Sequence, residues 1–598
     1  DQLEEEFQED LEKDFIGFFE TFLLVFAGVA LLVAMFSIYN TFSILVAQRT
    51  RESALLRALG ASRRQVLRSI TIEALVVGVV ASALGLAAGI GIAHGLLALL
   101  ESMGVDLPGT VVVEPRTVII SMIVGVVVTL VASVAPAVRA SRVPPLAAMR
   151  EVAVERVRGS FVRGVVGVAF ATLGVALVLG SSGGGALATA GLGAVAALVG
   201  MVLLGPVVAR PVTAVLGTPV SAVRGSAGRL ARRNAMRNPR RTSASASALM
   251  IGVAVVTMFT VFAASIKASV KELADEFVYA DIVVAVDDFS GVGMDPAFAT
   301  AVAELPELEH VVGAGEGVAL LGDDTIYPMI VDVPAMPGVA DMDVIAGSLE
   351  SVGLDGLAVH EDFAEDHGLS IGSTVPLRFA DGATVDFRVD AIYELSNLFG
   401  DVLMNRASYV PHATQPTDVV VLATLADGTT LEEAKAAVQA VADEFHAPDV
   451  LDRDEYLDSV NAEIDQALGL VYGLLGLAVI IAVMGIANTI ALAVHERTRE
   501  LGLLRAVGQS RRQTRTMVRW ESVMIAVFGT IGGVVLGSFL GWGMVRAVGA
   551  EEGIGEFALP LSSLAVVLVL GATAGVLAAV RPARRAARLD VLKAIATT

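Results

Sequence analysis

The sequence of 598 residues contains no cysteine, which excludes disulfide bridges and metal or iron–sulfur sites that need thiolate ligands. Lysine is scarce, because 37 of the 42 basic residues are arginine. The dipeptide Gly-Lys does not occur, although a phosphate-binding loop of the form GxxxxGK[ST] requires it. The chain therefore lacks a Walker-type nucleotide site, and ATP hydrolysis by that route must come from another polypeptide.

Long apolar runs dominate what is present. The mean hydropathy is +0.71 and 55% of the residues are hydrophobic, which argues against a soluble globular protein. Many runs reach the roughly 20 residues needed to cross a bilayer core of about 30 Å. Nine membrane spans are predicted, at 18–46, 69–100, 117–138, 163–181, 186–209, 243–266, 467–494, 520–548 and 561–580.

The charges are divided between the connecting segments. Residues 267–465 hold 40 acidic and 7 basic residues, whereas loop 210–242 holds eight arginines and no acidic residue. Because loops rich in arginine stay on the cytoplasmic side, the alternation of spans places the acidic block outside. Alternating β-formers at 280–286, 373–395 and 418–425 and an amphipathic pattern at 431–445 predict an α+β domain there.

A repeat organises the chain. RTRESALLRALGASRRQ at 49–65 returns as RTRELGLLRAVGQSRRQ at 497–513, with 13 of 17 positions identical. Asn40, Glu73, Asn488 and Glu521 also occupy matching positions, so we predict two copies of a three-helix unit. A helix and an outer domain precede the second copy. By symmetry the acidic residues 1–14 would end a first outer domain, with a tenth helix upstream.

These observations predict a mostly α-helical polytopic membrane protein with an α+β extracytoplasmic domain. The predicted regions are 1–17, the end of a first outer domain or stalk; 18–150, the first three-helix unit with a cytoplasmic helix at 48–66; 151–215, an inserted two-helix hairpin; 216–266, a basic amphipathic segment plus a transmembrane helix; 267–466, the acidic outer domain; and 467–598, the second unit with a cytoplasmic helix at 496–514.

The repeated motif itself has two interpretations. On a helix it forms a leucine stripe surrounded by arginines, which would suit a connector resting on lipid headgroups. That reading does not explain why Glu52, Gly60 and Ser62 have counterparts in Glu500, Gly508 and Ser510. We therefore favour a surface that docks another protein, used twice.

The motif resembles the R-x-x-E-x-x-x-L-R-A-x-G pattern of the FtsX/MacB-like permeases, the type VII ABC transporters, and residues 460–508 resemble the family's signature stretch throughout. The resemblance implies two coupling helices that seat in clefts of cytoplasmic ATPase subunits. The implied docking residues are Arg51, Glu52, Leu55, Leu56, Arg57, Gly60, Arg499, Glu500, Leu503, Leu504, Arg505 and Gly508. Asn40, Glu73, Asn488 and Glu521 are expected to serve helix packing or the transmission of movement.

Other motifs are interpreted structurally. Gly180, Ser182 and Gly184 match a nucleophile elbow, but no strand precedes them, so a hairpin turn is favoured. The run from His360 to His367 could present metal ligands, yet a solvated helix is the simpler reading, and no metal site is predicted. Small-residue faces are predicted at Gly85/Gly89 and Gly533/Gly537/Gly541 for close helix packing.

The predicted function is that of a non-enzymatic ABC transporter permease in a bacterial plasma membrane, which moves its outer domain by mechanotransmission. Two copies of a cytoplasmic ATPase would bind ATP and Mg²⁺, and this chain would bind no cofactor. Beyond the lipid bilayer, an extracytoplasmic lipoprotein or cell-wall component is an expected partner, and nucleic acid is not. Several alternatives remain for the process that this movement would drive. They are the export or extraction of a lipid, lipoprotein, peptide or drug; the detoxification of antimicrobial peptides; and the regulation of a cell-wall hydrolase. An adhesin or receptor that works without an ATPase is a further alternative.

Overall fold

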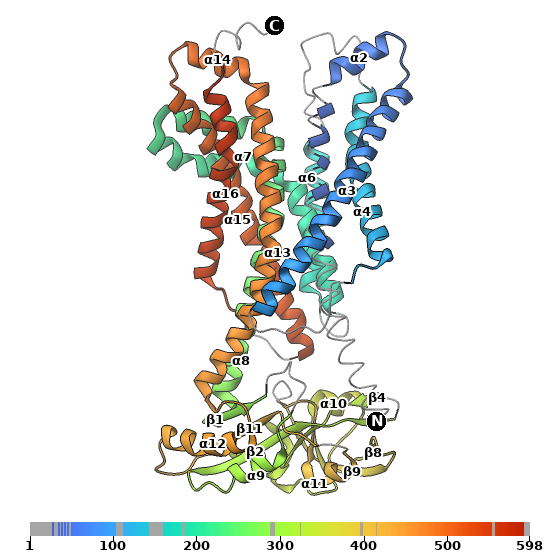
Figure 1. The fold of residues 1–598 in the computed structure, drawn as a ribbon, viewed down its shortest axis with the longest axis vertical. Helices are drawn as coiled ribbons and strands as arrows, with labels where there is room; N and C mark the ends of the chain where they lie inside the picture. Colours follow the sequence, from blue (N-terminus) through green and yellow to red (C-terminus); the bar gives the residue numbers. More distant parts are fainter. Residues whose placement is uncertain are drawn as a thin grey trace.

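The computed structural model describes residues 49–102, 112–142, 160–181, 186–286, 293–322, 324–394, 399–413, 416–552 and 556–590, with scattered positions between 27 and 46. Figure 1 shows an elongated molecule with long helices in the middle and an α+β domain at one end. Two short helices, α2 (Thr50–Ala58) and α14 (Thr498–Ala506), lie at the opposite end. The acidic block and the repeated motif are thus at opposite ends of the molecule.

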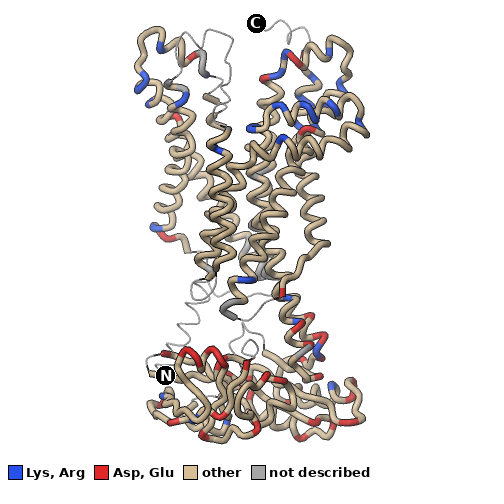
Figure 2. The backbone as a smooth tube through the Cα atoms, turned by 180° about the vertical axis from the view of Figure 1, so that it is seen from behind, with Lys and Arg blue, Asp and Glu red and all other residues tan. Residues whose placement is uncertain are grey.

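The charge distribution follows the same axis. Figure 2 shows the acidic residues spread over the outer domain and the basic residues gathered at the opposite end, where α2 and α14 lie. Between these two ends the long helices carry few charges. This separation is the pattern that the positive-inside rule predicts for a protein with α2 and α14 in the cytoplasm.

The second and third helices of both predicted three-helix units are present among the described residues. The first contains α3 (Arg63–Ser102) and α4 (Pro115–Arg142) after α2, and the second contains α15 (Arg511–Glu552) and α16 (Leu561–Ala587) after α14. In each unit the two long helices pack against each other. A long helix, α13 (Arg453–Glu496), leads directly into α14.

In the described part of the chain, three further long helices lie between the first unit and the outer domain. α6 (Ser160–Leu179) and α7 (Ala186–Arg237) pack as a pair, and α8 (Pro239–Phe277) packs along α15. Within the described ranges, seven helices contain a segment long and apolar enough to cross a membrane, namely α3, α4, α6, α7, α8, α15 and α16. They confirm seven of the nine predicted spans.

The other two predicted spans have a different status. Span 467–494 falls inside α13, whose apolar described part is Val483–Glu496. Span 18–46 lies mostly outside the described residues, and so does the predicted outer segment 1–17. The assignment of these two spans therefore stays a prediction, as do the domain boundaries.

The coupling helices are shorter than the predicted ranges 48–66 and 496–514. Gly60 (φ 105°) and Gly508 (φ 109°) adopt a left-handed backbone that glycine accepts readily, and this ends α2 and α14. Ser62 and Ser510 then begin the next helices, since their hydroxyls accept hydrogen bonds from the amides of Gln65 (3.3 Å) and Gln513 (3.2 Å). Each predicted range is therefore a short helix, a turn and the first turn of a long helix.

The outer domain is built on one mixed 12-stranded sheet in the order β12-β1-β11-β2-β5-β10-β7-β9-β8-β3-β4, with β6 paired to β9. Its strands are β1 (Ile282–Ala285), β2 (Leu308–Glu316), β3 (Ala319–Leu321), β4 (Asp324–Ile326), β5 (Met329–Val331), β6 (Val344–Gly347), β7 (Gly356–His360), β8 (Thr374–Arg378), β9 (Thr384–Tyr393), β10 (Val402–Asn405), β11 (Val420–Leu425) and β12 (Leu451–Asp452). The β8–β9 hairpin turns at the Asp-Gly pair 381–382, where Gly382 has a φ of 83°.

Helices cover parts of this sheet. α9 (Pro296–Val302) and α12 (Leu431–Phe445) place Phe298, Val302 and Val438 against the buried faces of β1 and β11. Four shorter segments, α10 (Glu361–Asp366), α11 (Arg406–Tyr409) and the 3₁₀ turns η2 (Val333–Gly338) and η3 (Leu349–Ser351), fill connections between strands, and η4 (Val410–His412) follows α11. The α+β outer domain is thus confirmed.

Candidate functional site

The coupling helices are held to the next helix by an arginine that precedes each of them. Arg49 contacts both carboxylate oxygens of Glu73 on α3 at 3.1 Å. Its repeat counterpart, Arg497, lies 3.8 Å from the carboxylate of Glu521 on α15. The two units therefore use matching residues to fix the angle at which each coupling helix leaves the bundle.

A second arginine of the motif ties each coupling helix to the third helix of its unit. The Arg57 guanidinium donates a hydrogen bond to the carbonyl of Ser141 at the end of α4 (3.2 Å). Arg505 donates in the same way to the carbonyl of Leu589, just after α16. These arginines were predicted to dock a partner, and the structure places both in contacts within the chain.

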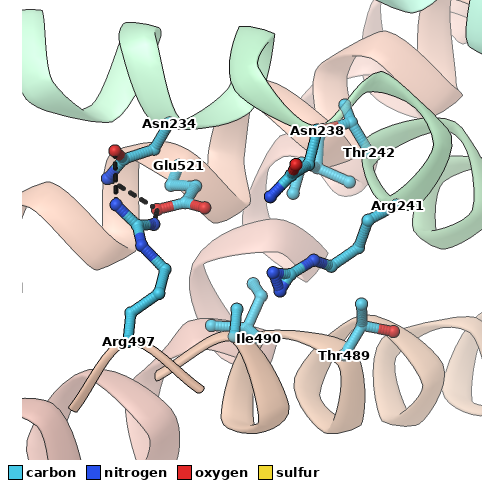
Figure 3. A pocket seen from close by; sticks show the side chains of 10 residues that line it. Asn234, Asn238, Arg241, Thr242, Thr489, Ile490, Arg497 and Glu521 are labelled. Atoms are coloured by element: carbon cyan, nitrogen blue, oxygen red, sulfur yellow. Dashed lines mark hydrogen bonds and ion pairs between the residues drawn. The ribbon is translucent and has the colours of Figure 1, made fainter. Parts of the chain in front are cut away.

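The second coupling helix has further contacts with the end of α7 (Figure 3). Arg497 donates to the Asn234 side chain (2.5 Å), while Arg237 pairs with Glu500 (3.2 Å). Arg241 at the start of α8 pairs with Glu496 (2.9 Å). A cavity of about 20 Å³, with room for a single water molecule, is lined by Asn234, Arg241, Arg497 and Glu521 among other residues.

Glu500 is therefore engaged inside the chain rather than fully exposed to a partner. Partial burial by itself would raise the pKa of its carboxyl group. The hydrogen bond and the charge of Arg497, together with Arg237, outweigh burial and hold this pKa below its ordinary value. The carboxylate is thus ionised at neutral pH and keeps its two arginines in place.

The surfaces that face outward from the coupling helices are apolar. Leu55, Leu56 and Leu503 are exposed, and the residues just before the terminating glycines are more so, with Leu59 86% and Val507 88% exposed. Exposed arginines of the following helices flank them, at Arg63, Arg64, Arg511 and Arg512. We call Leu55, Leu56, Leu59, Leu503 and Val507 the apolar ridges. A pair of apolar ridges rimmed by cations is suited to insertion into a partner's cleft.

The remaining predicted residues lie as follows. Glu52 and Arg499 are exposed and Leu504 is half-buried, while the side chain of Arg51 and all of Asn40 fall outside the described residues. Asn488 donates a hydrogen bond to the Thr41 hydroxyl (3.1 Å), so it bridges the two units across 447 residues of sequence. This contact is an interhelical hydrogen bond of the kind expected for that position.

The other motifs have local roles in the described part of the chain. His360 caps α10 by accepting a hydrogen bond from the Asp362 amide (3.2 Å) and also contacts the Glu394 carbonyl, and His367 contacts the Phe363 carbonyl. Among the described residues no group of three or more His, Asp or Glu side chains could hold a metal ion. Ser182 and Gly184 lie outside the described residues.

Sequence reasoning did not identify Asn234, Arg237 and Arg241 as part of this site. They belong to the segment 210–242, whose eight arginines without an acidic residue were read only as a sign of topology. An excess of cations of this size implies that some of them meet carboxylates elsewhere in the chain. Which carboxylates they meet depends on tertiary packing.

Comparisons with known proteins identify the class. The family model for the FtsX-like permease C-terminal domain matches residues 24–145 and 472–591, and the MacB-like periplasmic core domain matches residues 242–441. These matches coincide with the two repeated units and with the segment that includes α8 and most of the outer domain. The chain belongs to the ABC transporter permeases of the FtsX/MacB type. It is a membrane protein, and a permease of this kind implies a cytoplasmic ATPase partner.

Several curated relatives are similar to this chain. An uncharacterized ABC transporter permease protein of Mycobacterium tuberculosis is 24% identical over 98% of this chain and 71% of its own length. The pyoverdine export ATP-binding/permease protein PvdT of Pseudomonas syringae is 24% identical over 49% of this chain. The ABC transporter permease YtrF of Bacillus subtilis is 30% identical over 25% of this chain. The chain spans 47% of the length of PvdT and 38% of YtrF.

Two solved structures of extracytoplasmic regions are similar to part of this chain. The periplasmic region of MacB from Actinobacillus actinomycetemcomitans is 10% identical, covers 32% of this chain and 96% of its own, and has a TM-score of 0.25. The extracellular domain of the transporter YknZ from Gram-positive bacteria is 12% identical, covers 29% and 98%, and has a TM-score of 0.22.

Proposed function

We propose that this chain couples ATP hydrolysis by separate cytoplasmic ATPase subunits to movement of its outer domain. The observation that carries the proposal is α13, a single helix of 44 residues that begins at the outer sheet and ends at the second coupling helix. At 1.5 Å per residue such a helix is about 66 Å long. A displacement of α14 therefore has a rigid element along which it reaches the outer domain.

Both ends of α13 are firmly attached. At the outer end, Asp452 and Glu455 form a capping box, and the Arg453 guanidinium donates two hydrogen bonds to the Ala280 carbonyl beside β1 (3.2 and 3.1 Å). At the cytoplasmic end, Arg497 is the single residue between α13 and α14. Because neither junction contains a flexible linker, α13 would act as a lever.

Two coupling helices on one chain support two ATPase copies per permease. ATP and Mg²⁺ would bind on those subunits, since this chain has no Gly-Lys dipeptide, and the chain itself would not be an enzyme. The arginine-rich, lysine-poor composition supports a bacterial plasma membrane as its location. An extracytoplasmic lipoprotein or cell-wall partner for the outer domain belongs to the same proposal.

The substrate class follows from the membrane helices and the relatives. The described spans carry few charges, so they offer no evident hydrophilic path for a substrate. Work done outside the membrane on a lipid, lipoprotein, peptide or drug is consistent with this. PvdT is named for pyoverdine export, which supports export as the direction.

The docking part of the proposal is tested by changing the apolar ridges. We expect the double variant Leu59→Glu with Val507→Glu to lose the co-purifying ATPase, because two carboxylates would be buried unpaired in an apolar cleft. Val112→Glu is the matched control, since Val112 is also exposed and precedes α4 on the opposite side of the membrane. Retention of a P-loop ATPase by the double variant, measured by pull-down and mass spectrometry of the full chain, would overturn the docking assignment.

A further inference from the structure

The C-terminal part of α7 is a helical hairpin on the cytoplasmic side. The helix breaks at Gly225 (φ 56°, ψ −128°), and the chain then reverses direction. Across the turn, a Cβ atom at Gly228 would lie 3.0 Å from Cα of Ser221, and one at Gly217 would lie 2.9 Å from Cβ of Arg232. The two arms, 206–224 and 226–237, are thus packed closely enough to form one rigid body, which we call the cytoplasmic hairpin.

The first arm exposes an apolar face. Val207, Val215 and Val223 are exposed, with Val215 70% exposed, and Pro211 and Pro219 are exposed beside them. The opposite side of the arm, including Ala209 and Val220, is buried against the bundle. Leaving such a face in water is unfavourable, because the transfer of apolar surface from water to an apolar environment lowers the free energy.

The second arm exposes cations. Arg229 and Arg233 lie one helical turn apart and are exposed, and neither pairs with a carboxylate among the described residues. Three other arginines of the segment 210–242 are already engaged, since Arg224 lies over the Trp520 ring and Arg237 and Arg241 pair with glutamates. The hairpin therefore carries a net positive charge that the described part of the chain does not neutralise.

The location of the hairpin decides what these two surfaces meet. Figure 1 shows it projecting sideways from the bundle beside α16, at the end of the molecule opposite the outer domain. The predicted span of α7 ends at residue 209, so the hairpin follows directly on the membrane-crossing segment and lies near the cytoplasmic interface. An apolar face next to arginines at this depth is the pattern of an interfacial helix. The cytoplasmic leaflet presents phosphate groups at the same depth, and anionic headgroups attract arginine.

We propose that the cytoplasmic hairpin is a binding surface for anionic phospholipids of the cytoplasmic leaflet. Val207, Val215 and Val223 lie at the boundary between acyl chains and headgroups, and Arg229 and Arg233 bind the headgroup phosphates. The proposal does not depend on the proposed transport function, because it concerns only the chain and its membrane.

The test uses the absence of cysteine, which makes any introduced cysteine a unique labelling site. Val215→Cys carries a fluorophore in the full chain, reconstituted in nanodiscs of phosphatidylcholine and phosphatidylglycerol. The matched control is Val507→Cys, the same substitution at an exposed coupling-helix residue. We expect spin-labelled lipids to quench the fluorophore at 215 and an aqueous quencher to act on the one at 507.

Specificity for anionic lipid is measured with the same label. Spin-labelled phosphatidylglycerol should quench position 215 about fivefold or more over spin-labelled phosphatidylcholine, since each arginine near an anionic surface contributes on the order of 1 kcal/mol. Arg229→Gln with Arg233→Gln should abolish this preference, whereas Arg63→Gln with Arg64→Gln, an equal loss of charge elsewhere, should not.

Three results would overturn the proposal. Aqueous quenching at position 215 would place the hairpin outside the membrane interface. If the two double arginine variants lost the phosphatidylglycerol preference equally, the preference would be an effect of net charge and not of binding by Arg229 and Arg233. Shielding of position 215 only after purified ATPase is added would assign the surface to a protein partner.

Discussion

At the residue scale, the repeated motif has an inward and an outward side. Its arginines at 49, 57, 497 and 505 face inward, where they bind a glutamate of the next helix and a carbonyl of the third. The residues of the apolar ridges face outward, whereas Leu501 is buried and Leu504 is half-buried. The repeated arginines therefore position the coupling helix within the chain, and the apolar ridges form the surface that can contact the proposed partner.

The two glutamates that receive these arginines differ in burial, and this predicts unequal effects. Glu521 has a side chain only 14% exposed, whereas that of Glu73 is 38% exposed. Arg497→Gln should destabilise the chain by about 3 kcal/mol, because it removes the cation beside the buried Glu521 carboxylate (3.8 Å) and leaves only the neutral Asn234 amide (3.4 Å) as its partner. Arg49→Gln should cost about 1 kcal/mol or less, since water solvates Glu73.

Thermal unfolding of the detergent-solubilised chain measures both effects. The double variant Arg497→Gln with Glu521→Gln serves as the control, because neutralising the carboxylate should restore much of the lost stability. Equal losses for the two arginine variants, or no rescue by the second substitution, would contradict the assignment of Glu521 as a buried partner of Arg497.

At the element scale, the glycine faces show what packing decides. On α15, Gly529, Gly533 and Gly541 lie against carbonyl oxygens of α8, and a Cβ atom at these positions would approach within 2.6, 2.7 and 2.9 Å of them. Gly537 meets Ala254 and Thr257 in the same way. The helices can approach this closely because glycine has no side chain. The face predicted at Gly533/Gly537/Gly541 is confirmed.

The corresponding face of α3 differs. Side chains at Gly85 and Gly89 would meet no described atom within 4 Å, so the predicted packing role is not observed there. The sequence placed small residues at matching positions of both units, but periodicity cannot show whether a neighbouring helix is present.

This difference predicts a contrast between two equivalent substitutions. Gly537→Leu should destabilise the chain by roughly 1–3 kcal/mol, because a Cβ atom at this position would lie only 2.6 Å from Cβ of Thr257 and the new side chain would collide with it. Gly89→Leu should be neutral or slightly stabilising, since leucine favours a helix more than glycine does. Thermal unfolding compares the two variants, and a larger loss for Gly89→Leu would contradict the packing described for α15.

At the scale of the whole molecule, α13 connects the two ends. The outer domain lies at one end of this helix and α14 at the other (Figure 1). A mechanical coupling through α13 requires that the helix stay continuous. Flexibility introduced near its outer end should therefore separate movement of the coupling helix from movement of the outer domain.

The corresponding prediction concerns a short run of glycines inserted after Asn461 in α13. In a complex with the ATPase, ATP and Mg²⁺ should change the distance between spin labels at Glu444→Cys on α12 and Val112→Cys before α4. We expect the glycine insertion after Asn461 to abolish this change in distance, because glycine breaks helix continuity. The same insertion at Gly428, in the turn before α12, is the control. If ATP and Mg²⁺ still changed the distance between the spin labels in the variant with glycines after Asn461, α13 would not be the lever.

Local patterns were sufficient for most of the architecture. Apolar runs predicted seven confirmed spans, and the distribution of arginine predicted their orientation. The repeat at 49–65 and 497–513 predicted the two units. These features could be predicted because they depend on neighbouring residues and on the membrane as solvent. Contacts between distant segments needed the tertiary structure. The Arg497–Asn234 and Arg237–Glu500 contacts, the use of one glycine face over the other, and the reversal of α7 at Gly225 all depend on which helices pack together. Sequence periodicity specifies the face that a helix buries, whereas only packing in three dimensions selects the helix that covers it.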